Sequence, residues 1–186
     1  ETVCRSIQEW KVRGIEPVRV SVNFSKLHLR NENLANQILG IMRKYKVDSK
    51  YIEVELTEVS DYEDCQAMKA FVDVMRENGI SVSIDDFGTG YSTLNVLKNF
   101  NVNVIKLDKS LLDNIGNKDS FDEVVVKNVV NLAKEMNKDV IAEGVETEIQ
   151  AKFLSDINCN SVQGFLFDMP LKQEEFEERL SGTLPY

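Results

Sequence analysis

Residues 81–92 read SVSIDDFGTGYS, a short apolar strand that ends on two adjacent carboxylates and continues into a loop with two glycines. Apolar residues alternate with serines in its first half, as in a β-strand with one buried face. Asp85 and Asp86 then stand where the strand ends. Neighbouring carboxylates repel each other unless a cation lies between them. This stretch therefore predicts a strand that delivers a pair of acidic ligands to a turn.

The same arrangement recurs along the chain, because each predicted strand ends on or near a carboxylate, an amide or a lysine. Besides strand 80–85, these are 18–23 with Asn23, 51–57 with Glu55 and Glu58, 102–107 with Lys106 and Asp108, 139–142 with Glu143, and 161–166 with Gln163. Helical spacing of apolar residues predicts helices between and around the strands, at 2–13, 33–46, 62–78, 92–99, 121–137, 147–157 and 172–181. A repeating βα unit with polar groups at strand ends is typical of a (β/α) barrel.

We therefore expect an α/β fold of the TIM-barrel type, with six of its eight strands in this chain. A closed barrel of this class has eight strands in about 250 residues, so two strands are expected to precede residue 1 of a single domain over 1–186. An open six-stranded α/β sheet is the alternative, but such sheets usually bind ligands at one switch point. Polar groups on every strand favour the barrel.

The composition limits the function. The net charge of −9 disfavours non-specific binding of nucleic acid polymers, and an anionic substrate would need metal ions to mask the carboxylates. Cys4, Cys65 and Cys159 form no CxxC motif, which favours free thiols in a reducing compartment over a zinc site. No apolar run is long enough to span a membrane, so we expect no direct membrane contact from this chain.

The strand-end oxygen donors are hard ligands, which suit Mg²⁺ or Mn²⁺ better than zinc. One of the two adjacent aspartates can bridge two divalent ions while the other binds the second ion alone. The alternatives are structural: a solvated Asp-Asp turn before the glycines, and Asn23 as a turn cap. A glutamate within a strand, such as Glu55, is harder to explain structurally because buried carboxylates are costly unless paired.

Lys106 and Asp108 are two residues apart and so share one face of their strand. The lysine could neutralise carboxylates, position a water molecule or form a Schiff base, which would suit a lyase. A buried Lys–Asp ion pair is the structural alternative. The only histidine, His28, follows a strand and is expected to serve packing or a helix start rather than catalysis.

Six segments together carry a resemblance over nearly the whole chain: VSVN, ELTE, DDFGTGYS, KLDKS, AEGVET and QGFLF, in that order. The sequence resembles the EAL domain family, bacterial phosphodiesterases that hydrolyse cyclic di-GMP to linear pGpG. The resemblance implies a variant TIM barrel with two Mg²⁺ or Mn²⁺ ions, located in the bacterial cytoplasm. It also implies a homodimer that associates near the DDFGTG loop, and GGDEF or sensor domains attached in the full protein.

The resemblance also implies roles for particular residues. Asn23, Glu55 and Asp85 would hold one metal ion, and Asp85, Asp86 and Glu143 would hold the second. Lys106 would orient or help to activate the attacking water, with Glu143 also in the catalytic set. Glu58 would brace the DDFGTG loop, while Gln163 and Asp108 would lie on the substrate side.

One departure concerns the Glu-Ala-Leu motif that names the family, which is absent from these residues. In the family it lies on the strand before VSVN, within the two strands that the barrel count leaves missing. We interpret the gap as truncation, and expect the chain alone to hydrolyse cyclic di-GMP poorly. A non-catalytic cyclic di-GMP receptor or scaffold is the main alternative function, although such relatives usually lose metal ligands that are present here.

Overall fold

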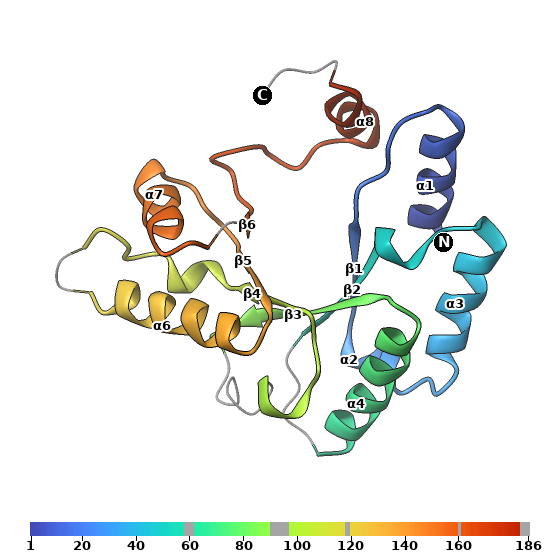
Figure 1. Ribbon diagram of the computed structural model, residues 1–186, viewed down its shortest axis with the longest axis horizontal. Helices are drawn as coiled ribbons and strands as arrows, with labels where there is room; N and C mark the ends of the chain where they lie inside the picture. Colours follow the sequence, from blue (N-terminus) through green and yellow to red (C-terminus); the bar gives the residue numbers. More distant parts are fainter. Residues whose placement is uncertain (58–61, 90–96, 118–119, 160, 183–186) are drawn as a thin grey trace. The chain divides into compact units, whose positions relative to one another are not determined.

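The computed structural model describes residues 1–57, 62–89, 97–117, 120–159 and 161–182 (Figure 1). Its six strands form one sheet in the order of the sequence, β1 to β6, and the strand pairs with a defined register are parallel. The chain divides into two compact units, Glu1–Val82 with Pro170–Tyr186, and Ser83–Met169. The boundary lies within strand β3. The expected α/β class with six parallel strands is confirmed.

The first unit contains two complete strands and most of the helices that flank them. Its elements are α1 (Thr2–Val12), β1 (Val20–Phe24), α2 (Lys26–Leu29), α3 (Leu34–Tyr45), a 3₁₀ turn at Ser49–Tyr51, β2 (Ile52–Thr57), α4 (Tyr62–Glu77) and α8 (Gln173–Ser181). Helix α3 contacts both α1 and α4, and Figure 1 shows the three side by side. The long helices are amphipathic and turn apolar side chains such as Ile7 and Met75 into the interior.

The second unit repeats the βα pattern. Its elements are β3 (Ser81–Phe87, from Ser83 onward), β4 (Val104–Leu107), a 3₁₀ turn at Lys109–Leu111, α6 (Asp122–Glu135), β5 (Asp139–Ala142), α7 (Glu148–Asp156) and β6 (Ser161–Val162). Ile105, Leu107 and Val130 are fully buried between these strands and helices. No helix among the described residues is both long and apolar enough to cross a bilayer.

Strand β2 shows why the sheet carries polar groups on one face. All of its residues from Ile52 to Leu56 are buried, so both faces of the strand are covered. The apolar residues alternate with Glu53 and Glu55, and successive side chains of a strand point to opposite faces. One face therefore packs as an apolar layer, and the other gathers carboxylates.

Most expected elements are found within a few residues of their predicted bounds, and one strand is shorter than expected. The strand expected at 161–166 ends at Val162, because the amide of Leu166 bonds to the Val145 carbonyl and the chain turns. The helix expected at 92–99 lies mostly outside the described residues, which show helix at 97–99. His28, expected in a structural role, lies in the short helix α2, where its Nδ1 accepts a hydrogen bond from the Ser25 amide at 3.1 Å.

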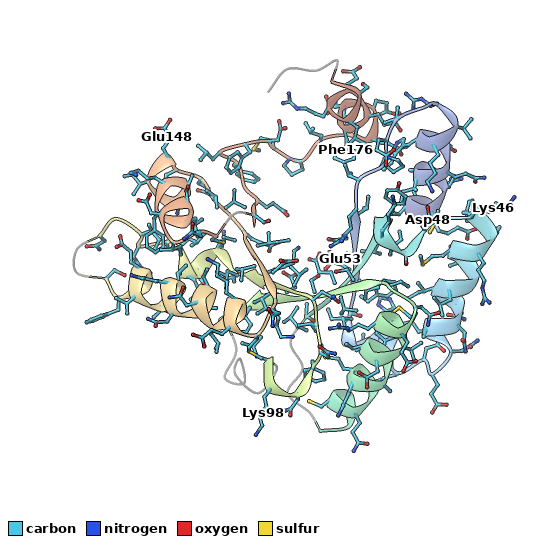
Figure 2. The ribbon with its side chains drawn as sticks, in the orientation of Figure 1. Lys46, Asp48, Glu53, Lys98, Glu148 and Phe176 are labelled. Carbon is cyan, nitrogen blue, oxygen red and sulfur yellow. The ribbon has the colours of Figure 1, made fainter. Side chains whose placement is uncertain are left out.

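Helix α8 is attached to α1 by a cluster around Glu177. The Glu177 carboxylate accepts hydrogen bonds from the Trp10 indole at 3.1 Å and the Gln173 amide at 3.0 Å, and it pairs with Arg13. Phe176, labelled in Figure 2, packs against the Trp10 ring at a centroid distance of 5.9 Å. Bonds from Gln173, Arg13 and Trp10 lower the pKa of Glu177 from 4.5 to about 2.

We predict that Glu177→Gln removes a pH-dependent part of the stability. A carboxylate whose pKa is lower in the fold stabilises it above the unfolded pKa, and this contribution disappears as pH falls from 4.5 through about 2. The difference in melting temperature between wild type and variant should therefore be largest near neutral pH and shrink below pH 4. Glu174→Gln, on the exposed side of the same helix, is the control. A pH-independent difference would contradict the assignment.

Candidate metal centre

The adjacent carboxylates Asp85 and Asp86 lie in an irregularity of strand β3. The register runs from Ile84 opposite Ile105 to Phe87 opposite Leu107, so β3 has one residue more than β4 over this span. Asp86 takes a left-handed backbone conformation with φ of 55°. An extra residue of this kind breaks the alternation of a strand and redirects a side chain. At this bulge Asp85 is half-buried and Asp86 is exposed, so the structure brings only Asp85 of the two into the acidic group with Glu143.

Asp85 provides the most direct indication of a candidate cation site. Its Oδ1 atom is buried and has no hydrogen-bond partner among the described residues. A carboxylate oxygen of Asp85 and one of Glu143 lie within 4.8 Å of each other. Leaving a buried charged oxygen unsatisfied costs on the order of 1–3 kcal/mol or more. A divalent cation with oxygen ligands would fit this position, because it would satisfy Oδ1 and offset the repulsion.

Lys106 is buried and directly pairs with Glu143. Its Nζ lies 2.6 Å from Glu143 Oε1, and its side chain is only 6% exposed. Burial raises the pKa of Glu143 and the Asp85 carboxylate raises it further, while the Lys106 ammonium opposes both. The net direction is upward, so a single lysine does not compensate for the gathered negative charge. A Lys106–Asp108 ion pair was the structural alternative for this lysine, and the structure pairs Lys106 with Glu143.

Two aspartates near this pair, Asp86 and Asp108, have opposite environments. Burial raises the pKa of Asp86, and the charges of Asp85 and Asp108 add to the effect. For Asp108 burial also acts upward, but bonds from the amide and hydroxyl of Ser110, at 3.0 and 2.5 Å, leave the pKa lowered. Asp108 thus caps the turn after β4 as a stable anion, whereas Asp86 would gain most from a nearby cation.

A cavity of about 250 Å³ opens beside these groups within the second unit. Its lining residues come from the turns after β4, β5 and β6: Asp108, Lys109, Glu143, Gly144, Glu146, Gln163, Gly164 and Phe165. The structure thus brings together three predicted site residues, Asp108, Glu143 and Gln163. Gln163 is exposed and directly follows β6, where its side chain is accessible to a ligand.

Glycines hold the three turns against one another. A Cβ on Gly144 would lie 2.4 Å from Lys109 Cβ, and a Cβ on Gly164 would lie 2.1 Å from the Val145 carbonyl oxygen. Gly144 also has φ of +67°, which side chains rarely adopt. Backbone bonds between Val145 and Gln163 complete the contact. Backbone packing, rather than side-chain packing, therefore fixes the shape of the cavity.

The remaining predicted ligands belong to the first unit. Asn23 on β1 and Glu55 on β2 are direct partners in the parallel register, so their Cα atoms are neighbours at the ends of adjacent strands. Glu55 is 4% exposed and Asn23 is exposed. Glu58, expected to brace the DDFGTG loop, lies outside the described residues, as does Gly90 of that loop. Its role stays a prediction.

Comparison with known proteins decides the family, because the model of the EAL domain matches residues 1–170. The chain belongs to the EAL domain family. It is 35% identical over 182 residues to the oxygen sensor protein DosP of Escherichia coli, covering 98% of this chain and 23% of DosP. It is 32% identical over 175 residues to the bifunctional diguanylate cyclase/cyclic di-GMP phosphodiesterase MucR of Pseudomonas aeruginosa, covering 94% and 25%.

Solved EAL domains share the fold. The EAL domain of Mycobacterium smegmatis DcpA matches with a TM-score of 0.89 and 30% identity, covering 99% of this chain and 83% of that one. The MucR phosphodiesterase in complex with c-di-GMP matches with a TM-score of 0.85 and 32% identity, covering 94% and 70%. These matches support the TIM-type barrel of EAL domains over an open sheet. The chain spans about a quarter of the curated relatives' length.

Five of the eight residues that line this cavity were not predicted as site residues, among them Glu146 and Phe165. Glu146 and Phe165 line it together with Gln163. Both stand in segments that carried the resemblance, AEGVET and QGFLF, but neither lies at a strand end. Their short distance in sequence from a predicted site residue, three residues from Glu143 and two from Gln163, was the signal available. Strand periodicity could not predict them, because they lie in turns that fold back toward the sheet.

We predict that Gly164→Ala lowers the melting temperature by several degrees and reduces ligand binding in the cavity. The added methyl would have to displace the Val145 carbonyl, and overpacking of this kind typically costs about 1–3 kcal/mol. Gly40→Ala in α3 is the matched control, since its Cβ would meet no heavy atom within 4 Å and should leave stability unchanged or higher. Equal melting temperatures for Gly164→Ala and wild type would show that the contact yields easily.

Proposed function

We propose that this protein is a metal-dependent phosphodiesterase that hydrolyses cyclic di-GMP to linear pGpG. The observation that carries the proposal is the buried Asp85 Oδ1 without a described hydrogen-bond partner, beside Glu143 and a single lysine. The names of relatives indicate the substrate, because MucR and NbdA of Pseudomonas aeruginosa are named cyclic di-GMP phosphodiesterases. A structure of the MucR phosphodiesterase is a complex with c-di-GMP.

The proposed metal ligands are those that the family resemblance implies. Asn23 and Glu55 with Asp85 would hold one ion, and Asp85 and Asp86 with Glu143 would hold the second. Carboxylate and amide oxygens favour Mg²⁺ or Mn²⁺. When bound, two such ions lower the pKa of water and stabilise charge on the phosphate oxygens. The high pKa of Glu143 and Asp86 in the absence of cations supports their place in this set.

The remaining roles follow from position. The buried Lys106 ammonium, paired with Glu143, is placed to donate a hydrogen bond to an attacking water or a phosphate oxygen. Its engagement as a charged donor disfavours the alternative Schiff-base lyase, which needs a neutral amine. Gln163 and Asp108 line the cavity and would contact the nucleotide. Glu58 would brace the DDFGTG loop, as the resemblance implies.

We extend the proposal to the partners and location of the whole protein. The bifunctional name of MucR supports an attached GGDEF domain, and the resemblance supports a homodimer. Cys4, Cys65 and Cys159 form no disulfide among the described residues, and we propose the reducing bacterial cytoplasm on this basis. A non-catalytic receptor would bind the same nucleotide without product, so detection of linear pGpG separates the two functions.

We predict that hydrolysis by the full-length domain requires Mg²⁺ or Mn²⁺ and that Ca²⁺ does not replace them, because its larger and looser coordination fits a two-metal site poorly. Asp85→Asn should lower kcat by orders of magnitude, since the amide cannot bridge two cations. The matched control is Asp113→Asn, an exposed aspartate outside the proposed set. Chromatographic measurement of pGpG checks both outcomes. Normal turnover in excess chelator would refute the proposed metal dependence.

We predict that Lys106→Met lowers kcat more than it weakens binding of cyclic di-GMP. The variant keeps the length of the buried stem but removes the charge paired with Glu143. An interaction made mainly in the transition state affects kcat and kcat/KM together. Steady-state kinetics and calorimetric binding, with Lys127→Met on the exposed side of α6 as the control, check this split. Loss of affinity with kcat preserved would assign Lys106 to substrate recognition instead.

A further inference from the structure

A second glutamate of β2, Glu53, is held by donors from both neighbouring strands. Its side chain is 3% exposed, and its carboxylate accepts hydrogen bonds from Ser21 Oγ on β1 and Ser81 Oγ at the start of β3, each at 3.1 Å. The Arg19 guanidinium lies 3.6 Å from the same carboxylate. Figure 2 labels Glu53 among the side chains of the first unit. Unlike Asp85, this buried carboxylate has its charge compensated by protein groups.

The Glu53 cluster lies two residues along the strands from the proposed metal ligands Asn23 and Glu55. In the parallel register Ser21 is opposite Glu53, and Asn23 is opposite Glu55. Residues two apart in a strand share a face, with a separation of about 6.6 Å. Glu53 and its donors therefore form the rung that precedes the Asn23–Glu55 pair on the same face of the sheet.

The alternation of apolar residues with two glutamates in β2 does not by itself fix the register of β2 against β1. Shifting a strand by one residue moves its apolar side chains to the wrong face, so burial excludes such a shift. A shift by two residues keeps every face and would place Glu53, instead of Glu55, beside Asn23. The bonds from Ser21 and Ser81 oppose that shift, because it would separate a buried carboxylate from its donors.

We propose that Glu53 is a positioning residue that sets the register in which Glu55 reaches Asn23, and through it the affinity for the divalent ion. The inference rests on the proposed function, since it takes Asn23 and Glu55 as metal ligands. Glu53 itself contacts neither ion nor substrate. Its hydrogen bonds with Ser21 on β1 and Ser81 on β3 hold β2 in one register and so fix the position of Glu55. Groups that orient metal ligands in this way generally raise the affinity for the metal.

The test measures Mn²⁺ binding to the protein by electron paramagnetic resonance, without substrate. The double variant Ser21→Ala/Ser81→Ala should raise the Mn²⁺ dissociation constant by about 10–100-fold, the usual effect of removing groups that orient metal ligands. Ser21→Thr, which keeps the hydroxyl and suits a strand, should bind as wild type does. Ser6→Ala removes a hydroxyl of α1 that accepts a bond from Gln173, and should leave the dissociation constant unchanged.

Melting temperatures in chelator separate positioning from a general loss of stability. The double variant and Ser6→Ala should melt within a few degrees of each other, although only the former binds Mn²⁺ weakly. Wild-type affinity in the double variant would overturn the role of Glu53 and leave the metal site intact. Absence of Mn²⁺ binding in wild type would overturn the proposed function as well. Should the double variant not fold, the single Ser21→Ala variant decides by the same criterion.

Discussion

Repulsion between carboxylates collected at the carboxyl ends of parallel strands is the constraint on which the site depends. The second unit places Asp85, Asp86, Asp108 and Glu143 near one another, with Lys106 as the buried cation. Neutralisation by hydrogen bonds succeeds only for Asp108, whose pKa falls, while those of Asp86 and Glu143 rise. Such an arrangement stabilises a bound cation more than it stabilises the empty fold.

Close contacts at glycines hold the turns around these carboxylates together. Residues with larger side chains could not make these contacts. The bulge in β3 interrupts the strand at Asp85 and Asp86, and Gly144 and Gly164 allow neighbouring turns to approach within van der Waals distance. In the first unit, Glu53 shows the opposite solution, a buried carboxylate satisfied by serine and arginine donors. The contrast between Glu53 and Asp85 separates a structural carboxylate from one suited to bind metal.

The strands and most helices could be predicted because burial enforces periodicity, and the strand ends identified Glu55, Asp85, Lys106 and Glu143. The bulge could not be predicted, since the sequence IDDF reads equally well as a regular strand end. The turn that shortens β6 depends on Gly164 meeting Val145, a contact between distant segments. Glu53 was missed because nothing in YIEVELTE distinguishes it from Glu55; only its partners on neighbouring strands do.

The central claim is that Asp85 and its neighbours bind two divalent cations. Crystals of the protein grown with Mn²⁺, measured at the manganese absorption edge, test it directly. The account predicts two anomalous peaks about 3.5–4 Å apart, both in contact with Asp85 and one also with Asp86. A single peak, or none beside Asp85 at saturating Mn²⁺, would contradict it.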